Sequence, residues 1–271
     1  MAGDHSTLTV FCGQFQPGLD EMANLDQIAS AVSSAHHSGA RLAVFPEYSQ
    51  TFGPEQGADW VERAADRDGA FVTALSGVSD RAEGMLIIAG MLEQSAHDRP
   101  HNTLVCVHDT GMVGACQKIH LYDAFGHRES EWLAPAAIAD PEIVALGPWR
   151  IGMQTCYDLR FPEVSRRLVD AGANLIVIPA QWVPGPLKLE QWRTLLMARA
   201  IETQCFVVAA GQPAPSGVGH SMVVSPRGEV VAEAGESPTD LLATIEASVV
   251  EAVRGENPMA EARRFGVVWK R

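Results

Sequence analysis

Three reactive side chains stand at or near the ends of apolar segments that read as strands: Glu47, Lys118 and Cys156. The ends of strands are where an α/β sheet usually places its chemistry. A thiol needs a base to become a thiolate, and a nearby cation to stabilise that anion and any oxyanion formed later. A carboxylate, an ammonium group and a thiol are therefore a complete set for acyl transfer. Spacing alone does not show that they meet, and each has a plainer reading: a capping or surface carboxylate, a solvated lysine and a structural thiol.

The surroundings of Cys156 are the most informative of the three. The residues that follow it are Tyr157, Asp158 and, after one leucine, Arg160. A cysteine in a packed core would not need such a polar turn, because buried thiols behave as small apolar side chains. We therefore interpret Cys156 as a nucleophile.

The rest of the chain alternates between short apolar runs and segments with apolar residues at helical spacing. Strands are expected at 8–12, 41–45, 85–90, 102–108, 113–120, from 149, 174–179, 205–210, 220–225, 230–232 and 241–245. Helices are expected at 17–35, 59–75, 162–171 and 187–203. Buried strands need cover on both faces, so the pattern predicts an α/β fold of layered sheets with helices outside.

The composition narrows the classes of protein that the chain can belong to. Its 271 residues, 46% hydrophobic and 20% charged, are ordinary for a globular protein. We find no linker or repeat, so we expect one domain over 1–271, with 257–271 as an extended C-terminal arm. The formal net charge of −13 argues against nucleic acid as a partner, because phosphate binding needs a basic face.

Localisation and redox state also follow from the sequence pattern. No apolar run approaches the roughly 20 residues of a membrane span, and the first residues lack the pattern of a secretory signal. The five cysteines include no CxxC pair. We therefore expect no membrane partner, and reduced thiols in a cytoplasmic protein.

The sequence resembles the nitrilase (carbon–nitrogen hydrolase) superfamily in several motifs that occur in the family's order. The three catalytic segments are Phe45-Pro46-Glu47, Gln117-Lys118-Ile119-His120-Leu121 and Thr155-Cys156-Tyr157-Asp158-Leu159-Arg160-Phe161-Pro162-Glu163. Supporting matches are Asn102-Thr103-Leu104, Arg199-Ala200-Ile201-Glu202 and Gly219-His220-Ser221. One such motif would be weak, but three catalytic segments in order are specific.

The resemblance implies a four-layer αββα sandwich and a Glu-Lys-Cys triad. On that basis Glu47 is the general base, Cys156 attacks the carbonyl to form a thioester, and Lys118 stabilises the oxyanion with the backbone N–H of Tyr157. A second glutamate follows the lysine segment in the family, and Glu129 fits that position. It would hold Lys118 and the substrate in place.

Two further residues are candidates for substrate binding. Arg160 could clamp a substrate carboxylate, since a guanidinium group binds a carboxylate bidentately, or could only support its loop through a salt bridge. Trp182, in a loop after a strand end, could form a wall of the same pocket or simply pack. The histidines form no HExxH or Cys/His cluster, and no P-loop or GxGxxG is present, so we expect neither a metal nor a nucleotide cofactor.

The nucleophile segment is similar to the amidase branch that includes ω-amidase and deaminated-glutathione amidase. The resemblance implies hydrolysis of a small carboxylate-bearing amide to acid and ammonia. Alternatives are an N-carbamoyl amidohydrolase of the same family, a non-catalytic binding protein on the same scaffold, and a thiol redox sensor. The family also implies a homodimer or higher homo-oligomer.

Overall fold

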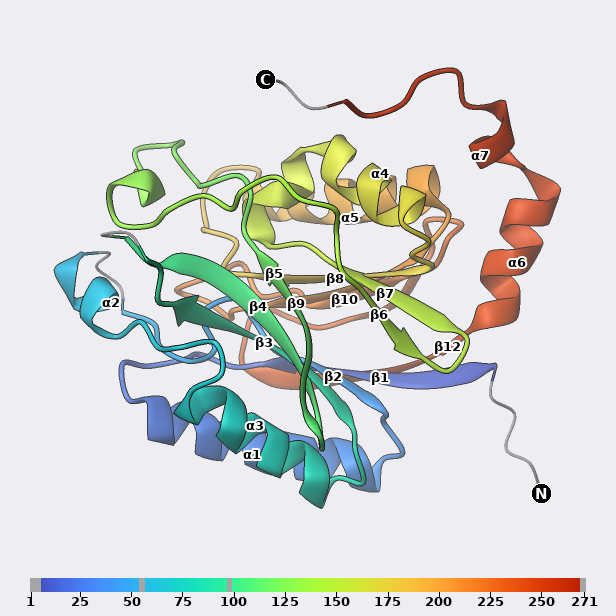
Figure 1. Ribbon diagram of the computed structural model, residues 1–271. Helices are drawn as coiled ribbons and strands as arrows, with labels where there is room; N and C mark the ends of the chain where they lie inside the picture. Colours follow the sequence, from blue (N-terminus) through green and yellow to red (C-terminus); the bar gives the residue numbers. More distant parts are fainter. Residues whose placement is uncertain (1–5, 54–56, 97–98, 269–271) are drawn as a thin grey trace.

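Two six-stranded sheets form the centre of the molecule. The computed structural model describes residues 6–53, 57–96 and 99–268. Two parts of the sequence predictions lie outside these ranges: residues 1–5, at the N-terminus that lacks a secretory-signal pattern, and residues 269–271, at the end of the expected arm. In Figure 1 the sheets lie one above the other, with α1 and α3 below them and α4 and α5 above.

The first sheet has the strand order β12-β1-β2-β3-β4-β5. Its strands are β1 (Thr7–Gln14), β2 (Leu42–Val44), β3 (Leu86–Glu93), β4 (His101–His108), β5 (Gly111–Gln117) and β12 (Thr239–Glu246). The β1, β2 and β3 strands are parallel, whereas β4 and β5 continue as antiparallel hairpin strands. The outer face is covered by α1 (Glu21–His37) and α3 (Ala70–Arg81).

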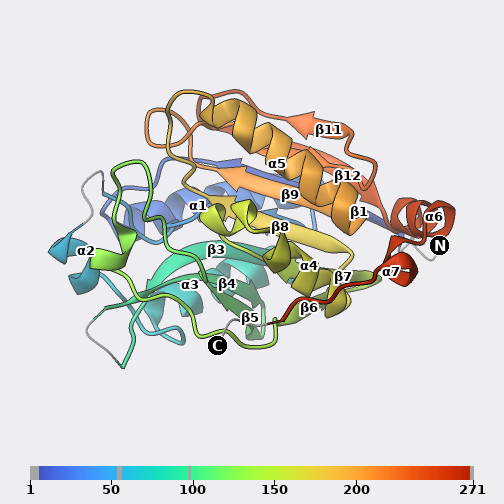
Figure 2. The same ribbon diagram turned by 90° about the horizontal axis from the view of Figure 1, so that it is seen from above.

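The second sheet has the strand order β11-β10-β9-β8-β7-β6. Its strands are β6 (Ile143–Leu146), β7 (Trp149–Met153), β8 (Leu175–Ala180), β9 (Phe206–Gly211), β10 (Met222–Val224) and β11 (Val230–Glu233). Here β7, β8 and β9 are parallel. Helices α4 (Pro162–Asp170) and α5 (Lys188–Thr203) cover its outer face, as the view from above shows (Figure 2).

The inner faces of the two sheets share one apolar core. Val10 and Val44 from the first sheet pack in it with Ile151, Val177 and Val208 from the second, all at most 1% exposed. In each strand these residues alternate with apolar residues that face the helices. Both faces of the strand are therefore buried, and the strand appears in the sequence as a continuous apolar run. The expected α/β sandwich is confirmed.

The observed elements differ from the expected ones in four places, and the first is strand β6 (Ile143–Leu146), which was not expected. The helix expected at 59–75 is two helices, α2 (Ala58–Glu62) and α3, separated by a polar stretch that ends at Gly69, the N-cap of α3. Helix α6 (Ala247–Glu256) was not expected at all. The arm from 257 is not extended throughout, because it begins with the short helix α7 (Met259–Ala262) and then runs back along α4 (Figure 2).

None of the helices in the described ranges is both long enough and apolar enough to cross a bilayer.

Candidate active site

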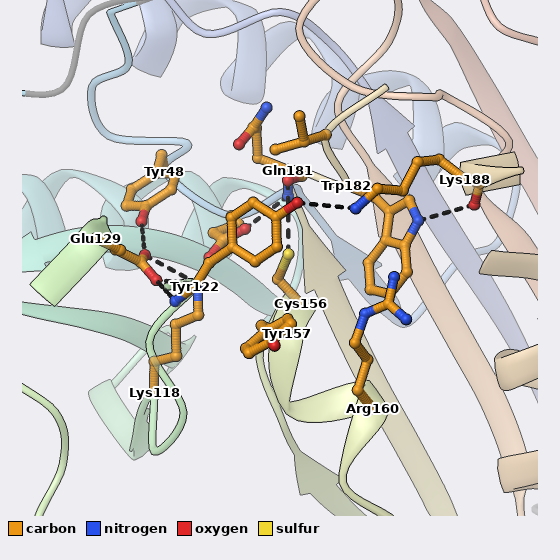
Figure 3. A pocket seen from close by; sticks show the side chains of 12 residues that line it. Tyr48, Lys118, Tyr122, Glu129, Cys156, Tyr157, Arg160, Gln181, Trp182 and Lys188 are labelled. Atoms are coloured by element: carbon orange, nitrogen blue, oxygen red, sulfur yellow. Dashed lines mark hydrogen bonds and ion pairs between the residues drawn. The ribbon is translucent and has the colours of Figure 1, made fainter. Parts of the chain in front are cut away.

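The side chains singled out by the sequence meet where strands of the two sheets end. Glu47 follows β2, Lys118 follows β5, and Cys156 follows β7 and begins the 3-10 turn η2 (Cys156–Arg160). Glu129 comes from the short 3-10 turn η1 (Glu129–Glu131). All four line one pocket, shown in Figure 3, which has about 350 Å³ of atom-free space including its open mouth.

A buried lysine joins two carboxylates at the base of this pocket. The Nζ atom of Lys118 lies 2.8 Å from Oε1 of Glu47 and 2.9 Å from the carboxylate of Glu129. The three side chains are at most 2% exposed. Burial alone would lower the pKa of Lys118, but the charges of Glu129 and Glu47 outweigh it and raise that pKa well above its usual value. The lysine is therefore a fixed positive charge.

Neighbouring groups hold both carboxylates in place. Asn102 donates from Nδ2 to Oε1 of Glu47 at 2.7 Å and to Oε1 of Glu129 at 3.4 Å. The backbone N–H of Gln181 donates to the other oxygen of Glu47 at 2.7 Å. Glu129 also accepts from the hydroxyl of Tyr48. Each oxygen of Glu47 thus accepts at least one hydrogen bond, which fixes the orientation of the group.

Backbone packing behind Glu47 depends on a glycine. A Cβ atom at Gly90, in β3, would lie 2.5 Å from the backbone nitrogen of Tyr48 and 2.9 Å from Cα of Glu47. Tyr48 itself has a φ of +61°, a left-handed conformation that is strained for an aromatic residue. The segment carrying Glu47 is therefore pressed directly against the β3 backbone.

Cys156 occupies a strained position with a neutral thiol. Its φ is +43°, its side chain is buried, and Sγ donates to the carbonyl oxygen of Gln181 at 3.5 Å. Burial raises the pKa of the Cys156 thiol well above its usual value, and the charge of Glu47 adds to this more than Lys118 offsets. The resting thiol therefore keeps its proton, and attack on a substrate requires a base.

The turn that carries Cys156 is fastened on two sides. Asp158 accepts hydrogen bonds from the backbone N–H of His120 at 2.9 Å and from that of Ile119 at 3.3 Å, directly after Lys118. From α5, the buried guanidinium of Arg199 donates to the carbonyl oxygen of Leu159 at 2.7 and 3.0 Å. Asp158 therefore supports the turn and also ties it to the lysine segment.

The outer part of the pocket contains aromatic rings and two cations. The guanidinium of Arg160 lies 4.7 Å from the ring centroid of Trp182, and its Nη2 donates to Gln191 at 2.6 Å. Lys188, the first residue of α5, donates from Nζ to the hydroxyl of Tyr122 at 2.8 Å. In Figure 3 Trp182 stands between Arg160 and Lys188.

All seven residues proposed from the sequence lie at this pocket. They are Glu47, Lys118, Glu129, Cys156, Tyr157, Arg160 and Trp182. Four further residues of the site were not predicted from the sequence: Tyr48, Asn102, Gln181 and Lys188. Two signals were available: Asn102 belongs to a motif that supports the resemblance, and a lysine at the start of a helix opposes the helix dipole.

The described part of the chain offers no site for a metal ion, since no group of three or more His, Cys, Asp or Glu side chains is suitably placed there. The pocket brings together a thiol, carboxylates and a fixed ammonium group.

Comparisons with known proteins point to one family. The family model described as carbon–nitrogen hydrolase matches residues 9–255. A deaminated glutathione amidase of Escherichia coli O157:H7 is 34% identical, over 95% of this chain and 98% of its own. A Mycobacterium tuberculosis protein named only as a hydrolase is 37% identical, over 91% and 92%. The crystal structure of Saccharomyces cerevisiae Nit3, of the nitrilase superfamily, superposes with a TM-score of 0.83 at 27% identity, over 96% and 97%.

Proposed function

The chain belongs to the carbon–nitrogen hydrolase family, and we propose that it hydrolyses a small carboxylate-bearing amide to an acid and ammonia through a thioester on Cys156. The observation that carries the proposal is the buried contact of Lys118 with Glu47 and Glu129 beside a cysteine in one pocket. Relatives named deaminated glutathione amidase and omega-amidase support an amide as the substrate.

The first half-reaction follows from the neutral state of the thiol. As Sγ of Cys156 bonds to the carbonyl carbon of the amide, Glu47 takes the thiol proton and the C=O electron pair moves onto oxygen. Lys118 and the backbone N–H of Tyr157 stabilise that oxyanion. When the C–N bond breaks, Glu47 returns the proton to nitrogen, ammonia leaves, and the acyl group stays on sulfur as a thioester.

The second half-reaction uses the same groups on a water molecule. Glu47 accepts a proton from water as the oxygen attacks the thioester carbon, and Lys118 again faces the oxyanion. The C–S bond then breaks, Cys156 recovers its proton through Glu47, and the acid is released. Glu129 keeps Lys118 charged and in place during both halves. Arg160 and Trp182 receive the far end of the substrate.

A screen for ammonia release across short ω-amides, amino-acid amides and carbamoyl compounds tests the proposal. We expect release from at least one carboxylate-bearing amide, and a mass increase of one acyl group on Cys156 when the reaction is quenched early. Carbon dioxide formed together with ammonia would identify a carbamoyl substrate instead.

Two cysteine variants form the matched control for this experiment. Cys156→Ala should abolish both ammonia release and the adduct. Cys116→Ala should retain both, since the Cys116 thiol donates to the carbonyl oxygen of Met153 at 3.2 Å and does not line the pocket. Turnover retained by Cys156→Ala on every substrate would sink the thioester mechanism.

A further inference from the structure

Lys188 is placed where a lysine is electrostatically unfavourable. It is 6% exposed and opens α5, so its charge faces the positive end of the helix dipole. No ion pair links it to a carboxylate among the described residues. Its partners are uncharged: the hydroxyl of Tyr122 at 2.8 Å and the ring of Phe125, 3.9 Å from Nζ. A buried ammonium group without a counter-charge is destabilising, so it needs an explanation other than stability.

Arg160, across Trp182 from Lys188, also lacks a counter-charge. Its guanidinium contacts the ring of Trp182 and the side-chain oxygen of Gln191, both uncharged. Its Nε is buried and makes no hydrogen bond within the described structure. No carboxylate lies within ion-pairing distance among the described residues. Arg160 was expected either to clamp a carboxylate or to form a supporting salt bridge, and no such salt bridge is present in the described ranges.

The pocket as a whole carries one uncompensated positive charge. Its lining contains three cations, Lys118, Arg160 and Lys188, and two carboxylates, Glu47 and Glu129. Both carboxylates contact Lys118, so this inner cluster carries one net negative charge. The outer two cations have no carboxylate partner in the lining, and the pocket as a whole is left with one positive charge. Burial lowers the pKa of Lys188, and so does the charge of Arg160, because the two cations repel each other. This excess occurs in a chain whose formal net charge is −13.

We propose that Arg160 and Lys188 together bind a single carboxylate at the far end of the substrate, and that Lys188 is a determinant of substrate specificity. The inference rests on the proposed function, which places the amide carbon at Cys156. One carboxylate supplies a partner for the free Nε of Arg160, replaces the weak contacts of Lys188 with a charged hydrogen bond, and brings the pocket to neutrality. The carboxylate of the proposed substrate would thus be held by two cations, one on the nucleophile turn and one at the start of α5.

Matched substrates separate the carboxylate from the rest of the molecule. Succinamate and 4-hydroxybutyramide share the amide and the spacer but end in a carboxylate and an alcohol; glutaramate and 5-hydroxypentanamide form the next longer pair. We expect kcat/KM to favour the carboxylate member of at least one pair, chiefly through KM. Lys188→Met should reduce this preference by about 10- to 100-fold, the effect of losing one charged hydrogen bond. Lys188→Arg should restore part of it.

A double-mutant cycle tests whether one carboxylate contacts both cations. If it does, the double variant should lose less of the carboxylate preference than the product of the losses in Arg160→Met and Lys188→Met. The reason is that each single change already weakens the same interaction. Multiplicative losses would assign them to different groups and overturn the shared carboxylate. Arg81→Met, which removes an exposed charge from α3, is the control for the change in net charge.

Binding measurements distinguish this inference from the proposed function. The affinity of Cys156→Ala for succinamate and for 4-hydroxybutyramide can be measured by calorimetry, with and without Lys188→Met, whether or not the chain turns these amides over. A carboxylate preference that depends on Lys188 supports the inference even if no acyl adduct forms on Cys156. An adduct formed with no preference for either member of both pairs overturns the inference and leaves the proposed function standing.

Discussion

Asn102 offers the sharpest test of how the site is organised, because its side chain contacts both carboxylates and its backbone holds the backbone of Lys118. Its amide Nδ2 donates to Glu47 and Glu129, and its carbonyl oxygen accepts from the backbone N–H of Lys118 at 2.8 Å. The substitution Asn102→Leu keeps the backbone contact and nearly the same shape. It removes only the two side-chain hydrogen bonds.

The structure predicts different magnitudes for stability and for activity. The 2.7 Å bond to the Glu47 carboxylate contributes about 1.5–3 kcal/mol, and the 3.4 Å contact little. Against this, Oδ1 of Asn102 is buried without a hydrogen bond in the described structure, and leucine removes that penalty of about 1–3 kcal/mol. The two effects largely offset each other, so the free energy of unfolding should change by less than about 2 kcal/mol.

Activity should fall further than stability, because Glu47 loses one of the groups that orient it. We expect kcat to drop about 10- to 100-fold with KM little changed, since Glu47 acts as the base of the chemical step in the proposed mechanism. Asn174→Leu is the matched control. Asn174 bonds the backbone N–H of Arg150 at 2.7 Å, at the opposite end of β7 from Cys156, so it should lose stability and keep kcat. Equal losses of kcat in the two variants, or an unchanged kcat in Asn102→Leu, would refute the reasoning.

Two further outcomes follow from packing and from buried thiols. Gly90→Ala should lower the free energy of unfolding by about 1–3 kcal/mol in urea titrations and reduce kcat, because its Cβ meets the backbone of Tyr48 and Glu47; unchanged stability would contradict this packing. Burial raises the pKa of Cys12 to about 12, and burial with nearby Asp158 does the same for Cys116. The contribution of each cysteine to the free energy of unfolding is therefore complete below the unfolded pKa of about 8.5, and it falls by about 1.4 kcal/mol per pH unit above that pKa. Cys12→Ala should make the decrease of the free energy of unfolding with pH shallower.

The fold could be predicted from the sequence to the extent that apolar patterns are local. Strands such as β8 are buried on both faces, so they appear as unbroken apolar runs between turn residues. Helix α6 escaped prediction because only Ala247, Val250 and Val253 are buried in it, which leaves a narrow apolar stripe. The order of strands within each sheet depends on contacts distant in sequence, which no local pattern encodes.

Some residues of the candidate site could be predicted from the sequence and others could not. Glu47, Lys118 and Cys156 each follow a strand, so their place in the sequence already suggested an edge where side chains could meet. Gln181 acts through its backbone N–H and carbonyl oxygen, and any residue type could supply these groups. No sequence pattern can therefore reveal its part in the site.

The buried charges at the site are better explained by function than by stability. Desolvating Lys118, Glu47 and Glu129 is unfavourable, and well-packed apolar residues are often as stable as a buried ion cluster. Burial raises the pKa of the Cys156 thiol, and the net negative charge of two carboxylates around one ammonium group adds to this, so the thiol is protonated at rest. A catalytic cysteine more often relies on a lowered pKa. In the proposed mechanism the proton moves to Glu47 as the sulfur attacks, so reactivity should depend on a substrate carbonyl held between Cys156 and Lys118.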